Sequence, residues 1–213
     1  MMMRHFCAIL FLFLIGTSHA ISADSSGTVQ FPVEAKNEII KKFPSLTNEG
    51  QFAQGDIDKD GLGDVVAIIQ YLEGQVAMER IIVLKGAADG SYSLMSQSAP
   101  FEPHMRRNEY LSFKGSSIYI TASSASYTDY AGNLYQFKKY ADGIFLIGLE
   151  YSEGVIGDEP TRHVSANFLT NKSIESLKTG NKRKIIHRSL QQKYKIPLEK
   201  FTLGDTVDGY SLK

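Results

Sequence analysis

Residues 65–84 read VVAIIQYLEGQVAMERIIVL, and this stretch decides the fold. Two runs of β-branched and aliphatic residues, Val65–Leu72 and Arg80–Leu84, lie on either side of Glu73-Gly74-Gln75. A short polar interruption that contains glycine is typical of the turn between two antiparallel strands. We therefore expect a β-hairpin here.

The chain beyond this hairpin continues the same pattern of short strands and tight turns. Turn sequences rich in Gly, Asp and Asn separate further β-prone runs, which are Tyr92–Met95, Tyr110–Phe113, Ser117–Ala122, Leu134–Tyr140, Ile144–Tyr151, Val164–Leu169 and Ser173–Leu177. Closely spaced strands of this kind are typical of antiparallel sheets. The Asp-rich loop described below has no second full copy, which argues against a propeller or a solenoid.

One helix is expected ahead of the hairpin, over Val33–Phe43. Its apolar residues fall on one face of a helix, and they are Val33, Ile39, Ile40 and Phe43. The predicted fold class is therefore α+β and mainly antiparallel β. We expect a bent sheet or a sandwich with one N-terminal helix.

The first 23 residues have the layout of a secretory signal peptide. A positively charged start precedes the apolar run Phe6–Gly16, and the small, polar segment Thr17–Ala23 follows it. Cleavage is expected after Ala20 or Ala23. The apolar run is roughly half the ~20 residues that a membrane-spanning helix needs. An uncleaved N-terminal anchor is the alternative.

Composition limits what the remaining chain can be. Of the 213 residues, 23 are Lys or Arg and 23 are Asp or Glu, so the neutral net charge gives no general reason to bind nucleic acid. The single cysteine, Cys7, excludes a disulfide framework and Cys-based metal sites. We expect residues 24–213 to form a single mainly-β domain that is periplasmic or extracellular, with no membrane span in the mature chain.

The segment just before the hairpin, residues 55–64, reads GDIDKDGLGD. Counted from Asp56, acidic residues occupy positions 1, 3, 5 and 9 and glycine occupies position 6. Calcium takes six to eight oxygen ligands at about 2.3–2.6 Å, and carboxylates at alternate positions converge when the backbone curls. The expected ligands of a structural calcium ion are the four carboxylates and one main-chain carbonyl, from Asp56, Asp58, Asp60, Asp64 and Leu62.

Other interpretations of this loop are weaker. It is not an EF-hand, because position 12 is Ala67 where that loop needs a bidentate Glu, and a strand rather than a helix follows. Magnesium prefers to keep its waters and would leave several carboxylates unused. The remaining alternative is a polar turn whose Asp side chains cap backbone amides.

Residues 55–69 (GDIDKDGLGDVVAII) resemble the calcium-loop-plus-strand unit of the FG-GAP/VCBS repeat families. In those families the loop holds a structural calcium ion at a turn between strands, so the resemblance implies the ion and its four carboxylates. More loosely, the chain is similar to a group of small exported bacterial proteins that open on such a loop. That second resemblance uses Ile81–Gly86, Leu146–Glu150 and Asn167–Lys172, and it implies no activity.

The search for catalytic residues finds only weak candidates. The three histidines that follow the signal peptide are far apart in sequence, and a structural role is expected for each of His104, His163 and His187. Four acidic residues, Glu150, Glu153, Asp158 and Glu159, leave open a carboxylate pair for glycan hydrolysis. The alternative for these four is a solvated loop.

Charge is spread unevenly along the chain. Ala23–Pro103 holds 6 basic and 12 acidic residues, whereas Asn171–Lys200 holds 9 basic and 2 acidic. The basic region is either the solvated face of strands and a terminal helix, or a docking surface for an acidic partner or an anionic envelope polymer.

Taken together, these patterns predict an exported, non-enzymatic calcium-binding protein that presents a sheet surface to a protein or envelope partner. One alternative is a periplasmic immunity-type inhibitor of a toxin. The other is an envelope glycan hydrolase that uses Glu150 and Glu153.

Overall fold

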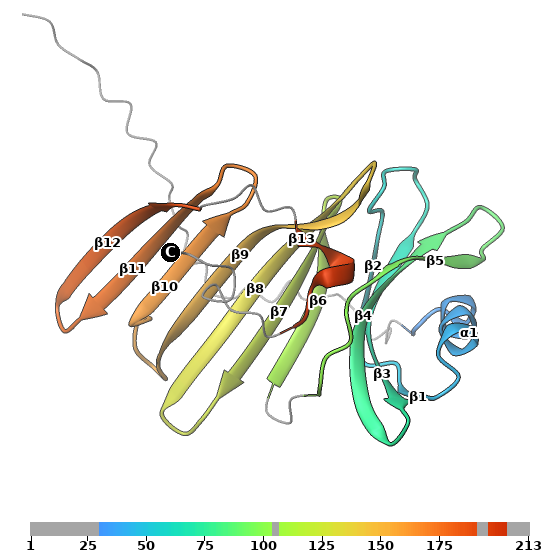
Figure 1. The fold of residues 1–213 in the computed structure, drawn as a ribbon, viewed down its shortest axis with the longest axis horizontal. Helices are drawn as coiled ribbons and strands as arrows, with labels where there is room; N and C mark the ends of the chain where they lie inside the picture. The colour runs from blue at the N-terminus through green and yellow to red at the C-terminus, as the bar shows by residue number, and fades with distance from the viewer. Residues whose placement is uncertain (1–29, 104–106, 191–195, 204–213) are drawn as a thin grey trace, which may run out of the picture. The chain divides into compact units, whose positions relative to one another are not determined.

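The computed structural model describes residues 30–103, 107–190 and 196–203. The expected signal peptide and His104 lie outside this part of the chain. From Phe31 onwards, the described residues belong to one compact unit, and they form one α-helix and two antiparallel sheets (Figure 1). The fold class predicted from the sequence, α+β and mainly antiparallel β, is confirmed.

The smaller sheet contains five strands and carries the predicted hairpin. Its strands are β1 (Leu46–Asn48), β2 (Phe52–Gly55), β3 (Asp64–Glu73), β4 (Val76–Gly86) and β5 (Tyr92–Gln97). They follow the order β1-β3-β4-β5, and β2 also pairs with β3. In the hairpin, Glu73 pairs with Val76, so the turn consists of Gly74 and Gln75. Gly74 has φ +64°, which only glycine adopts readily.

Strand β3 is apolar on both faces because both faces are covered. Val66 and Ile68 belong to the core shared with the larger sheet, whereas Val65, Ala67 and Ile69 pack towards helix α1 (Val33–Lys42). An unbroken apolar run is what a strand buried on both sides requires.

The predicted helix is present, but only part of its expected apolar face is buried, since Ile39 and Phe43 pack inward and Val33 and Ile40 do not. Ala35 and Ile39 are the buried residues of α1, whereas Val33 is 63% exposed and Ile40 is 42% exposed. Phe43, just after the helix, packs against Tyr71 with ring centroids 5.2 Å apart. The Ala35 side chain lies in the same buried apolar cluster as Val65, Ala67 and Ile69 of β3.

The larger sheet is a meander of neighbouring strands. It contains β6 (Arg107–Lys114), β7 (Ser117–Ala125), β8 (Asp129–Tyr140), β9 (Gly143–Val155), β10 (Arg162–Asn167), β11 (Lys172–Thr179), β12 (Lys182–Ser189) and β13 (Ile196–Pro197). Strands β6 to β12 lie side by side in chain order, and β13 pairs with β9. Each strand predicted from the sequence beyond Arg80–Leu84 corresponds to one of these strands or to β5.

One apolar core joins the two sheets. It combines residues of β3 and β4 with residues of β7 to β10. The fully buried Phe201, just after the 3-10 turn η1 (Leu198–Lys200), packs edge-on against Tyr135 and Phe137, with centroids 4.9 Å apart in both cases. Along each strand of such a core, buried residues that face inward alternate with residues that face outward.

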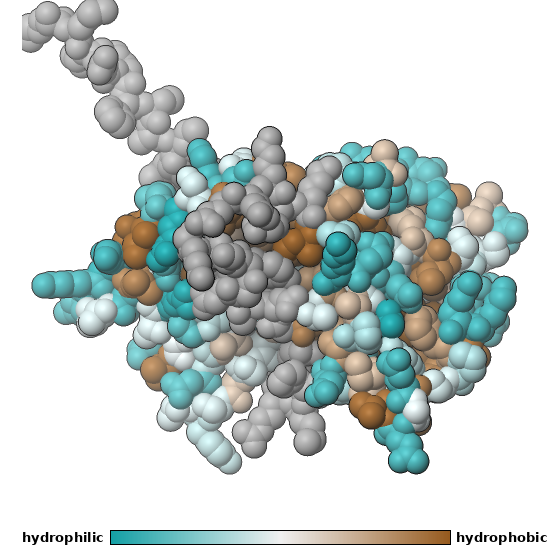
Figure 2. Space-filling model, in the orientation of Figure 1, coloured by the Kyte–Doolittle hydropathy of each residue, from teal (hydrophilic) through white to brown (hydrophobic). Residues whose placement is uncertain are grey.

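The basic region contains no terminal helix within its described residues. It forms β11, β12, β13 and only the short turn η1. Apolar side chains lie among hydrophilic ones at the β11–β12 end of the sheet (Figure 2), where Ile174 is 46% and Ile185 is 58% exposed. Strand β12 ends the sheet, and its charged, exposed residues are typical of an edge strand. Among the described residues, no helix is long and apolar enough to cross a membrane.

Candidate functional site

The Asp-rich loop connects β2 to β3 within the smaller sheet. These two strands pair from Phe52 with Ala67 to Gly55 with Asp64, so the loop closes an antiparallel hairpin. The sequence pattern does not indicate β1 or β2. Because both strands precede the loop, the loop does not lie ahead of the first strand. Lys59 (φ 65°) and Gly61 (φ +84°) adopt left-handed backbone conformations that curl the loop.

Asp56, at the first position of the loop, binds the loop backbone through both of its carboxylate oxygens. Its Oδ1 accepts a hydrogen bond from the Lys59 N–H at 2.7 Å, and its Oδ2 accepts one from the Gly61 N–H at 3.0 Å. Further along, Asp60 Oδ1 accepts from the Leu62 N–H at 2.9 Å. The capping turns considered as the alternative are therefore present, and they organise the loop.

Asp64 is the buried end of the loop. Its side chain is fully buried, and it accepts hydrogen bonds from the Ile57 N–H at 2.9 Å and from the Gly86 N–H at 3.1 Å. Burial raises the pKa of Asp64, against the opposing effect of these two amides. The Ile57 side chain is also buried in the core. Asp64 thus joins the start of the loop to the end of β4.

Three of the four expected carboxylates converge. Asp56, Asp58 and Asp64 each offer an oxygen, and these oxygens all lie within 4.8 Å of one another. Asp60 is not part of this group. The Leu62 carbonyl remains a prediction, since the contact that involves Leu62 is made by its N–H. The arrangement suits a hard cation that takes oxygen ligands.

A lysine that the Asp spacing does not indicate reaches the same loop. Lys85, near the end of β4, forms ion pairs with Asp58 and, at 2.7 Å, with Asp60. The hydrogen bond from Lys85 lowers the pKa of Asp60, and the two carboxylates raise the pKa of Lys85. The ammonium group therefore offsets part of the negative charge that four neighbouring Asp residues bring.

The loop can be reached from solvent. An open hollow of about 370 Å³ borders it, with Asp58 and Lys59 on one side and Lys138 and Tyr140, at the end of β8, on the other. A hydrated ion therefore has a path to at least one of the converging carboxylates.

The candidate hydrolase residues are not brought together. Glu150 lines a hollow on one face of β9, whereas Glu153 accepts a hydrogen bond from the Tyr151 hydroxyl, whose ring packs against the core on the other face. Residues three apart in a strand point to opposite faces. A glycosidase needs both carboxyl groups in one cleft, about 5–9.5 Å apart.

The other candidates have structural partners or open surroundings. Glu159 pairs with Lys178 at 3.3 Å and with Arg183 at 3.0 Å, and Asp158 is exposed in the same loop. His163 Nδ1 lies 2.9 Å from the Ser152 hydroxyl, and His187 is exposed on β12. These residues do not form a catalytic group within the described parts of the chain.

Comparisons of this chain with protein-family models, with curated proteins and with solved structures find no match.

Proposed function

We propose that this chain is an exported calcium-binding protein, in which loop 56–64 holds a structural calcium ion and the sheets present a surface to a protein or envelope partner. The observation that carries the proposal is the convergence of Asp56, Asp58 and Asp64. Three carboxylate oxygens within 4.8 Å repel one another, and a divalent cation among them removes that repulsion.

The donor set favours calcium over other metals. Every side-chain ligand is a carboxylate, which suits hard cations, and no Cys or His faces the group among the described residues. Asp56, Asp58 and Asp64 would hold the ion first, and Asp60 and the Leu62 carbonyl are the further ligands expected from the spacing. Calcium tolerates such mixed, flexible oxygen coordination better than magnesium does.

The proposed role of the ion is structural. Asp56 already binds the loop backbone through Lys59 and Gly61, whereas Asp64 binds Ile57 and the end of β4. An ion shared by Asp56 and Asp64 would link these two sets of contacts and fix the β2–β3 hairpin. Its contribution adds to stability because the unfolded chain offers no preformed site.

Lys85 is the internal competitor of the ion. Its ammonium group is paired with Asp58 and Asp60, two of the expected ligands. Calcium binding would then displace Lys85 from Asp58, and the lysine side chain, 40% exposed, can turn into solvent. A site with such a competitor binds calcium more weakly than the same loop without it.

The signal-peptide pattern supports the same proposal. The first 23 residues have a signal-peptide pattern, and extracellular modules bind calcium at about 0.1–1 mM, which matches the concentrations outside cells. A chain without a cysteine after residue 7 has no disulfide to stabilise it there.

A calcium-dependent melting experiment tests the proposal. The melting temperature of the chelator-treated protein should rise when calcium is added, and Asp58→Ala should abolish the rise. Asp89→Ala is the matched control, because Asp89 lies in another Asp-Gly turn, between β4 and β5. An unchanged melting temperature in calcium, or an equal rise in Asp58→Ala, would contradict the proposal.

A further inference from the structure

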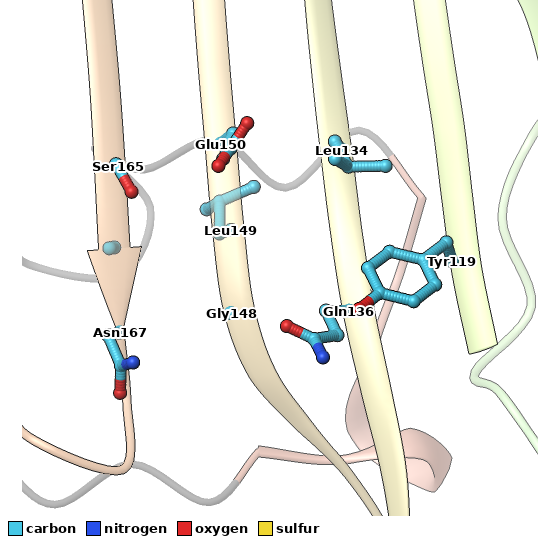
Figure 3. Close-up of a pocket in the computed structure, with 9 residues that line it drawn as sticks. Tyr119, Leu134, Gln136, Gly148, Leu149, Glu150, Ser165 and Asn167 are labelled. Atoms are coloured by element: carbon cyan, nitrogen blue, oxygen red, sulfur yellow. The ribbon is translucent and has the colours of Figure 1, made fainter. Parts of the chain in front are cut away.

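A hollow of about 180 Å³ lies on the face of the larger sheet that points away from the shared core. Four neighbouring strands, β7 to β10, contribute its lining (Figure 3). Two cross-strand rows form it. The first row runs Tyr119, Gln136, Gly148, Asn167, and the second contains Leu134, Glu150 and Ser165.

The hollow exists because Gly148 has no side chain. It sits between Gln136 and Asn167 in the first row, where every other strand contributes a polar or aromatic group. A Cβ at Gly148 would lie 3.2 Å from Gln136 Oε1 and would begin to fill the space. The main chain of β9 therefore forms the floor, and the neighbouring side chains form the walls.

The walls offer hydrogen-bonding groups that the protein itself does not use. Within the described residues, the Tyr119 hydroxyl, the Glu150 carboxylate and the Ser165 hydroxyl have no hydrogen-bond or ion-pair partner. Asn167 Oδ1 accepts from the Leu169 and Thr170 N–H groups, both at 3.0 Å, which fixes the side chain. Its amide group remains as a donor on the rim.

This chemistry selects a ligand class. The lining contains no Lys or Arg, so an anion would find no counter-charge there. It is too polar for an apolar ligand and smaller than the ~300–1,000 Å³ typical of sites for larger small molecules. Sugar hydroxyls both donate and accept hydrogen bonds, and the C–H face of a sugar ring packs on an aromatic ring. The mixture of hydroxyl, amide, one carboxylate and one Tyr suits such a ring.

We propose that this hollow binds one neutral hexose ring, as a monosaccharide or as a unit of a glycan. Glu150 accepts hydrogen bonds from sugar hydroxyls, Asn167 donates to one, and the Tyr119 ring packs along the sugar. Hydrogen bonds to a charged acceptor are stronger than neutral ones, so Glu150 provides most of the polar affinity. The inference supplies a partner class for the sheet surface in the proposed function, but it does not depend on the calcium ion.

Ligand-observed saturation-transfer NMR on the full chain tests it, with glucose, galactose, mannose and N-acetylglucosamine as probes. At least one of these sugars should bind, and binding should be equal in calcium and in chelator. It should also persist in Asp58→Ala, so that failure of the calcium site and failure of the sugar site are distinguishable.

Variants assign the binding to the hollow. Glu150→Gln, which keeps the shape of the side chain, should weaken the affinity about tenfold. Gly148→Val should abolish binding by filling the floor. Tyr127→Ala is the control, because Tyr127 is fully exposed in the turn between β7 and β8.

Two results would overturn the inference. One is the absence of binding to all four sugars. The other is sugar binding that neither Glu150→Gln nor Gly148→Val weakens, with both variants folded as judged by their melting curves.

Discussion

The Lys85 ammonium group lies 2.7 Å from a carboxylate oxygen of Asp60, and it also pairs with Asp58. Lys85 comes from β4, whereas both aspartates belong to the loop that connects β2 and β3. Strand β4 thus brings a positive group to the loop, next to the three carboxylates that converge. Whether a cation binds here depends on how Lys85 and the ion share these oxygens.

Replacing Lys85 should therefore strengthen calcium binding. In Lys85→Met the ion no longer competes with an ammonium group, and we expect the calcium affinity to rise about tenfold. Calcium titration by calorimetry measures the change. Lys59→Met is the control, since it removes a positive charge from the same loop outside these ion pairs. Equal effects of the two substitutions would show that only net charge matters.

Asp64 should matter for stability even without calcium. In Asp64→Asn, one of the two buried N–H donors, from Ile57 and Gly86, would face an amide NH₂ group instead of an oxygen. An unsatisfied buried donor costs about 1–3 kcal/mol. Urea unfolding in chelator should show this loss of unfolding free energy. A loss no larger than that of the exposed-turn variant Asp89→Asn would contradict the role given to Asp64.

Gly86 should tolerate no side chain. A Cβ at this position would lie 2.2 Å from the Gly63 carbonyl oxygen, which is part of the loop backbone. Gly86→Ala should therefore displace the loop and lower both the melting temperature and the calcium affinity. Gly63→Ala serves as the comparison, because a Cβ there meets nothing within 4 Å. Similar behaviour of the two variants would mean that the close approach of β4 and the loop is unimportant.

The ion pair of Asp60 predicts a pH dependence in calcium-free protein. The pKa of Asp60 is lowered from 3.8 by Lys85, so folding favours its ionised form. The resulting stability is present above about pH 4 and is lost as the pH falls through the lowered pKa. Melting curves of the wild type and Lys85→Met, recorded without calcium, should therefore converge on acidification. A difference in melting temperature that stays constant down to the lowest pH would contradict a stabilising Asp60–Lys85 ion pair.

Much of the fold could be predicted because its signals are local. The run Val65–Leu72 and the glycine turn at residue 74 specify the β3–β4 hairpin, and similar turns specify the meander of the larger sheet. The short strands β1 and β2 carry no such pattern. They pair with β3, and this contact between distant parts of the chain is not visible in their own sequences. Strand β12 could not be predicted because it is rich in Lys and Arg. Such a sequence suits an exposed edge strand and a solvated helix equally well.

The candidate site could be predicted in part. The Asp spacing indicated Asp56, Asp58 and Asp64, which converge through the curled loop. It could not show that Asp60 is held by Lys85, because that contact joins residues 25 positions apart, one in the loop and the other on β4. The sequence did carry one indication of this contact. With a two-residue turn at Gly74-Gln75, the strand register pairs Val65 with Leu84, so the next residue of β4, Lys85, lies beside the loop.

For the hydrolase alternative, closeness in sequence did not mean closeness in space. Glu150 and Glu153 are close in sequence, but a strand sends residues three apart to opposite faces. Their proximity in the chain therefore says nothing about a shared cleft until the strand is placed.

Isothermal titration calorimetry of the purified, chelator-treated protein counts the calcium ions that loop 56–64 holds. We expect one saturable calcium site per chain at up to about 1 mM free calcium, and its loss in Asp58→Ala. The absence of saturable binding in the folded wild-type protein over that range would contradict this expectation.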